Sequence, residues 1–163
     1  GQVVSDENSP AQPKGTPASA GALVGETVYV AGGNSGDGAT KNFWALDLAK
    51  RGAADFGWVT LPPWDGPART HLLASVQHDG ATDCLYIFSG RMKDGDGHWR
   101  MLGDAHKFNP NSGEWKKIHD ILPSGDGQPR CVMAGTVAPI GANQLLVFGG
   151  ANGKRFITPT GLA

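Results

Sequence analysis

Short apolar runs that end in small residues recur along the chain at nearly even spacing. They span residues 28–33, 85–90 and 145–150. The ends of successive runs lie 57 and 60 positions apart, slightly more than the roughly 50 residues of a kelch-type propeller blade. Their length and their content of β-branched and aromatic residues predict buried strands. We therefore expect a repeat protein whose third repeat is unfinished.

Turn residues divide the repeats into further short strand candidates, as four-stranded propeller blades require. The predicted strands are 18–24, 26–32, 43–49 and 57–61 in the first repeat, 72–77, 84–88, 104–109 and 114–118 in the second, and 132–138 and 144–148 in the third. No segment shows a sustained helical period. The prediction is an all-β fold, a kelch-type β-propeller of about two and a half four-stranded blades.

Two other features repeat in the same register. Trp58 and Trp115 each lie 25 positions after the glycine that ends an apolar run, and we expect them to fill the wedge between neighbouring blades. A junction rich in glycine and proline then ends in Arg69 in one copy and Arg130 in the next. The predicted organisation is a flexible leader or closing strand over 1–16, followed by blades over about 17–66, 67–127 and an incomplete 128–163.

Composition narrows the class of protein. The 25 glycines and 11 prolines suit many tight turns, and a hydrophobic content of 39% is enough for a packed core. A net charge of −1 without a basic run argues against nucleic acid or an anionic membrane surface as partner, and no stretch is long enough for a membrane span. Cys84 and Cys131 lie inside strand-like runs without motif spacing, so two buried free thiols are favoured over a disulfide.

Motifs for metals and phosphates are weak. Residues 94–98 read Asp-Gly-Asp-Gly-His, which suggests calcium but lacks the glycine and glutamate of an EF-hand loop, so a solvated turn is favoured. Zinc-ligand spacing is absent from the sequence. The glycine pairs after the apolar runs precede no helix and therefore do not predict a phosphate cradle. We expect neither a metal nor a cofactor.

Three motifs in succession resemble the N-acetylneuraminate epimerases, or sialic acid mutarotases. They are Gly-Pro-Ala-Arg at 66–69, the run at 85–90, and Asp-Ala-His-Lys-Phe-Asn-Pro at 104–110, and the resemblance extends over about 16–152. It implies a six-bladed, usually exported propeller that interconverts the anomers of N-acetylneuraminic acid. It thus implies a sialic acid or related sugar acid as substrate, a role in carbohydrate metabolism, and a periplasmic or secreted location.

The resemblance covers about half of such a propeller. The acidic and basic residues usually proposed for the chemistry of the family lie in later blades, so no catalytic position is carried over. Closing the ring then requires a second copy of the chain or the missing C-terminal half. A non-catalytic kelch module that binds a protein or glycan, and a purely structural fragment that closes only with another chain, remain as alternatives.

Candidate site residues follow from what a sugar acid needs. An arginine fork matches a carboxylate, and Arg69 and Arg130 recur where they would face the central channel; the alternative is a blade-to-blade hydrogen bond. Arg91 and Asn34 follow the small-residue pairs where loops enter the channel mouth. Mutarotation needs an acid and a base, and His71 is the suspected imidazole.

Tryptophans outside the repeated register are candidates for sugar stacking. Trp64 and Trp99 lie in loop-like sequence, and we expect them rather than Trp58 or Trp115 to meet a ligand.

Overall fold

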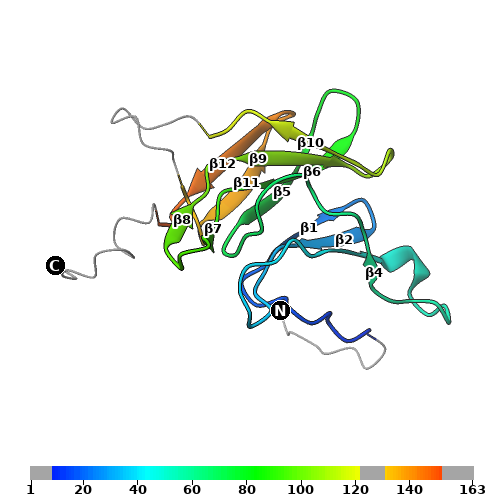
Figure 1. The fold of residues 1–163 in the computed structure, drawn as a ribbon. Helices are drawn as coiled ribbons and strands as arrows, with labels where there is room; N and C mark the ends of the chain where they lie inside the picture. The colour runs from blue at the N-terminus through cyan, green and yellow to red at the C-terminus, as the bar shows by residue number, and fades with distance from the viewer. Residues whose placement is uncertain (1–8, 122–130, 152–163) are drawn as a thin grey trace.

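The protein is described by a computed structural model over residues 9–121 and 131–151, and within these ranges it consists of antiparallel sheets that lie side by side in chain order (Figure 1). The first sheet has the order β1-β2-β3-β4, and the second has the order β10-β9-β6-β5. Their strands are β1 (Ala20–Val24), β2 (Thr27–Ala31), β3 (Phe43–Asp47), β4 (Val59–Thr60), β5 (Leu73–His78), β6 (Asp83–Phe88), β9 (Ala105–Asn109) and β10 (Glu114–Ile118).

The third sheet contains two strands, β11 (Thr136–Ile140) and β12 (Gln144–Phe148). The predicted all-β fold is confirmed, and two full meanders followed by a hairpin are the arrangement expected of successive propeller blades. The prediction that the third strand runs to residue 49 is wrong, because the side chain of Asp47 accepts the N–H of Ala49 at 3.0 Å and starts a 3-10 turn, η1 (Leu48–Lys50).

A hairpin that the sequence prediction missed lies between β6 and β9. Its strands, β7 (Arg91–Lys93) and β8 (Trp99–Met101), pair with each other as a separate two-stranded sheet. Each strand has only three residues, too short for an alternating apolar pattern to stand out in the sequence.

An aromatic cluster joins the first two sheets. The ring of Trp115, on β10, lies 4.8 Å from that of Phe43, on β3, and 5.1 Å from that of Phe108, on β9, measured between centroids. Its indole Nε1 donates to the carbonyl of Pro62 at 3.1 Å. Trp115 therefore fills the wedge between the blades, as predicted.

Trp64 belongs to this cluster and not to a ligand site. Its side chain is 0% exposed, its ring lies 5.8 Å from that of Trp115, and its Nε1 donates to the carbonyl of Pro67 at 3.1 Å. The prediction that Trp64 stacks on a sugar is therefore wrong.

Innermost strands approach one another around the axis, with β5 in contact with both β1 and β11. Ala18, His71 and Ala134, just ahead of these strands, have positive φ angles of 59°, 55° and 54°. The N–H of His71 donates to the carbonyl of Ala18 at 2.8 Å, and the N–H of Ala134 donates to the carbonyl of His71 at 3.0 Å. Backbone hydrogen bonds therefore link all three blades directly beside the axis.

Cys84 and Cys131 are buried and unpaired, which confirms the prediction of free thiols. Among residues 9–121 and 131–151, no helix is long and apolar enough to cross a membrane.

Candidate functional site

A cavity of about 640 Å³ lies where the loops after β2 and β6 face each other. The loop at residues 34–39 forms one wall and the β7–β8 hairpin forms the other, while Thr70 and His71 lie between them. Four residues singled out from the sequence line this cavity, from segments far apart along the chain: Asn34, His71, Arg91 and Trp99.

Backbone bridges hold the two walls in place. The N–H of Arg69 donates to Thr40 at 3.0 Å, and Thr70 and Arg91 exchange a pair of N–H to carbonyl bonds of 2.9 Å each. Between the walls, Gly90 has a φ of 100°, and a Cβ there would lie 2.7 Å from the carbonyl oxygen of Thr70. Only glycine allows this close approach, which delivers Arg91 directly into the cavity wall.

Cationic and aromatic groups meet on the hairpin. The guanidinium of Arg91 lies 4.0 Å from the ring centroid of Trp99, and the ammonium of Lys93 lies 5.2 Å from the same centroid. Stacking on an indole orients the guanidinium, whose planar fork of N–H donors matches the geometry of a carboxylate. This wall of the cavity therefore suits a carboxylate, although Asp37 and Asp94 also line the cavity and limit its positive charge.

Asn34 lies in a tight turn of the opposite wall. Its Oδ1 accepts the backbone N–H of Gly36 at 2.9 Å, which orients the side chain. The Nδ2 group is the remaining donor of this amide and is suited to a hydroxyl or carbonyl oxygen.

His71 lines this cavity and also a second one of about 400 Å³, which the innermost strands β5 and β11 border. Its Nδ1 lies 3.0 Å from the hydroxyl of Thr70. Burial, followed by the positive charge of Arg91, lowers the pKa of His71 below its usual value. The imidazole is therefore neutral at neutral pH.

The structure places Arg69 behind the cavity in a structural role, because its backbone N–H binds Thr40 of the first blade and its side chain binds within the second. Its side chain is 0% exposed and forms an ion pair with Asp104, and its Nη1 donates to the carbonyl of Ser89 at 3.1 Å. An enclosed guanidinium offers no edge to a ligand, so Arg69 supports the site rather than lining it. Arg130 lies outside the described residues.

The carboxylate of Asp104 accepts hydrogen bonds from two side chains. Its Oδ2 binds Arg69 and also His106 Nε2, at 2.8 Å from the latter. Burial by itself raises the pKa of Asp104, but the hydrogen bonds from His106 and Arg69 outweigh it and lower the pKa to about 2. The Asp104 carboxylate is therefore charged in the folded protein at neutral pH.

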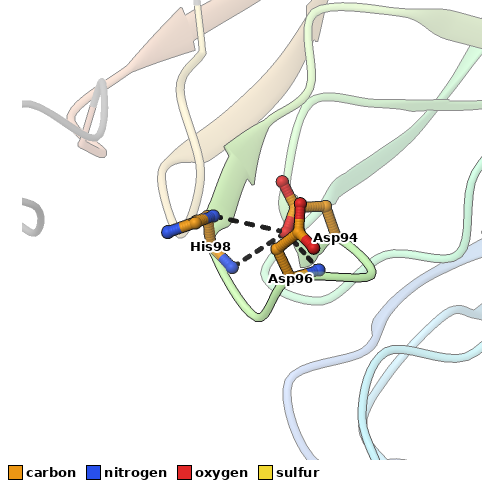
Figure 2. A group of neighbouring side chains, drawn as sticks. All are labelled: Asp94, Asp96 and His98. Atoms are coloured by element: carbon orange, nitrogen blue, oxygen red, sulfur yellow. Dashed lines mark hydrogen bonds and ion pairs between the residues drawn. The ribbon is translucent and has the colours of Figure 1, made fainter.

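Asp94, Asp96 and His98 come together at the tip of the hairpin, with ligand atoms within 4.8 Å of one another (Figure 2). Oδ1 of Asp94 accepts the backbone N–H of His98 at 2.9 Å and that of Asp96 at 3.1 Å, while Oδ2 accepts from Arg100 at 3.1 Å. The His98 N–H contributes most to holding the pKa of Asp94 below its usual value. These contacts are those of an Asx turn that closes a hairpin.

Lys93 and Thr70 are cavity residues that the sequence interpretation did not single out. Lys93 could have been found from the sequence, because the Asp-Gly pairs at residues 94–97 directly follow it and Asp-Gly is a strong hairpin signature. Thr70 carries no motif, and its position emerges only from the bridge to Arg91.

Comparison with known proteins agrees with this architecture. The family model for N-acetylneuraminate epimerase matches residues 9–158. N-acetylneuraminate epimerase of Haemophilus influenzae (strain PittEE) is 30% identical over 143 residues, which is 88% of this chain and 33% of that protein. The Escherichia coli (strain K12) protein of the same name is 31% identical over 136 residues, covering 83% of this chain and 32% of that one.

Among solved structures, YjhT superposes with a TM-score of 0.69 and 25% sequence identity, over 92% of this chain and 39% of that one. The fold is thus a kelch-type propeller fragment. Its match to the family model shows that this chain belongs to the N-acetylneuraminate epimerase family. The chain spans about one third of the length of the curated relatives it matches, less than the half expected from sequence.

Proposed function

We propose that this chain forms part of a sugar mutarotase that interconverts the anomers of N-acetylneuraminic acid. The observation that carries the proposal is the meeting of Asn34, His71, Arg91 and Trp99 in one cavity of a chain that belongs to the epimerase family. Arg91 binds the sugar carboxylate, and Asn34 binds a hydroxyl or the acetamido group from the opposite wall.

In this proposal Arg69 acts through the backbone instead of through the ligand. It binds the carbonyl of Ser89, two residues before Arg91, and so determines where the β7–β8 hairpin begins. In this proposal the guanidinium that binds the substrate carboxylate is that of Arg91 and not that of Arg69.

Completion of the ring is part of the same proposal. Two and a half blades cover 39% of YjhT, which corresponds to about six blades for a whole propeller, within the usual range of four to eight. The remaining blades come from further polypeptide or from a second copy. A periplasmic or secreted protein of carbohydrate metabolism fits this role.

The test is anomer exchange of N-acetylneuraminic acid followed by NMR on the assembled propeller. We expect Arg91→Ala to weaken sugar binding by roughly ten- to a hundredfold, the effect of losing a contact of about 1.5–3 kcal/mol to a charged group. Arg51→Ala is the matched control, because Arg51 is exposed on a turn and does not line the cavity. It should leave binding and exchange unchanged.

Two outcomes would contradict this assignment. Unchanged affinity in Arg91→Ala would remove Arg91 from the site. Tight sugar binding without any exchange in the wild-type assembly would instead favour a glycan-binding kelch module.

A further inference from the structure

We propose that His71 is the proton acceptor of this site and that it acts through Nε2. The inference rests on the proposed function and adds to it a catalytic residue and the protonation state in which that residue works. Three independent observations support it: the position of His71 beside the axis, the hydrogen bond made by Nδ1, and the charges that surround the ring.

His71 lies beside the axis, at a place that recurs in each of the three blades. Ala18, His71 and Ala134 occupy equivalent places in the three blades, with nearly the same left-handed φ and consecutive backbone hydrogen bonds. A left-handed conformation is unfavourable for a residue with a Cβ, and histidine adopts it more readily than most. Two of the three places carry only a methyl group, so His71 alone among them brings an ionisable side chain to the axis.

The two cavities meet at this residue. His71 lines the cavity between the loops and also the one bordered by β5 and β11. A sugar held by Arg91 in the first cavity therefore has the imidazole beside it.

Thr70 determines which ring nitrogen carries the proton. The Thr70 hydroxyl lies 3.3 Å from the carbonyl of Arg91, which can only accept, and we assign the single hydroxyl proton to that bond. Nδ1 of His71, 3.0 Å from the same hydroxyl, must then donate its own proton. In the neutral ring Nε2 is left with its lone pair, and it has no hydrogen-bond partner among the described residues.

The surrounding charges keep the ring neutral. Arg91 is the charged group that acts on His71, and its positive charge opposes protonation. Lys93, Asp37 and Asp94 are the other charged groups that line the first cavity, and the second cavity contains no titratable residue except His71 itself. Apolar burial on one side and a guanidinium on the other both favour the basic form.

The chemical step needs no cofactor. Nε2 takes the proton of the anomeric hydroxyl while the bond between the anomeric carbon and the ring oxygen breaks, and water supplies a proton to that oxygen. The products are an open-chain ketone with a new hydroxyl, a protonated imidazole and the hydroxide left by the water, which takes a proton back when the ring closes. Rotation about the bond to the anomeric carbon and reversal of both proton transfers give the other anomer and restore the neutral histidine.

The first part of the test uses the assembled propeller without sugar. ¹⁵N NMR of the histidine rings is expected to show His71 with its proton on Nδ1, and Thr70→Val is expected to lose this preference. His78, which is exposed, is the internal control and should be unaffected by the threonine change. A His71 ring protonated on Nε2 in the wild type would overturn the inference.

The second part measures exchange and affinity in the assembled propeller. His71→Asn tolerates the left-handed backbone, and we expect its kcat to fall about a hundredfold or more, as for loss of a general base, while sugar affinity stays within about twofold. Thr70→Val should reduce kcat less and shift its pH profile. An undiminished kcat in His71→Asn would overturn this inference alone, whereas absence of exchange in the wild type would overturn the proposed function together with it.

Discussion

Single residues decide how the cavity wall is built. Ser89 stands where the first and third apolar runs have glycine, and it keeps the glycine-like φ of 61°. Its carbonyl accepts from Arg69, and its hydroxyl accepts the backbone N–H of Val132 at 2.8 Å. One strained residue therefore joins two blades, because Ser89 and Arg69 belong to the second blade and Val132 belongs to the third.

The partly buried carboxylate of Asp104 gives a prediction at this scale. Its pKa falls from 3.8 to about 2 in the folded protein, so the stabilisation it provides is present above about pH 4 and is lost as the pH falls through about 2. Asp104→Asn should unfold more readily at pH 7, by about 3–5 kcal/mol, since it leaves Arg69 buried without its partner charge.

Chemical denaturation between pH 2 and pH 7 measures this difference. The gap in unfolding free energy between wild type and Asp104→Asn should narrow toward pH 2. Asp55→Asn, at an exposed ion pair with Lys50, is the control and should differ little from wild type at pH 7. A constant gap across the range would show that the carboxylate charge is not what stabilises this junction.

At the scale of elements, the sequence predicts strands well and contacts between them poorly. The apolar runs and the turn residues between them place nearly every blade strand within a few residues. Burial of Arg69 was not predictable in this way, since its partner Asp104 lies 35 residues further along the chain. The β7–β8 hairpin was missed for a different reason: each of its strands has only three residues, and the bridge from Arg91 to Thr70 has no signal in the sequence.

The wedge between the first two sheets supplies a second prediction. Trp115→Ala should cost about 3–5 kcal/mol, because it removes a ring packed on Phe43 and Phe108 and leaves a cavity between two blades. Trp99→Ala, at a ring that is 39% exposed on the hairpin, is the matched control and should cost much less. Thermal unfolding of both variants measures the difference, and equal melting temperatures would mean that Trp115 is not the residue that holds the blades together.

At the scale of the whole molecule, both flanks carry groups that a complete ring would satisfy. Within residues 9–121 and 131–151, the third sheet ends at β12, where Leu146 and Phe148 are 48% and 49% exposed, while the first two sheets each have four strands. On the other flank, the indole N–H of Trp58 is buried and has no acceptor among the described residues, whereas its counterpart Trp115 donates to Pro62 of the preceding blade. An unpaired strand edge and an orphaned buried donor are both costly in water.

We therefore predict that another polypeptide, either a second copy or the remaining blades, covers these flanks and offers a carbonyl to Trp58 as Pro62 does to Trp115. Light scattering of the purified chain should show self-association or aggregation, and addition of the remaining blades should give a single complex of defined mass. In that complex Trp58→Phe should weaken association, since it removes the indole N–H while keeping an aromatic ring. Trp44→Phe is the control, because Trp44 is already buried within the first sheet. A stable, monodisperse monomer of the chain alone would contradict the prediction, because it would show that the exposed edge of β12 and the buried Trp58 N–H are tolerated without a partner.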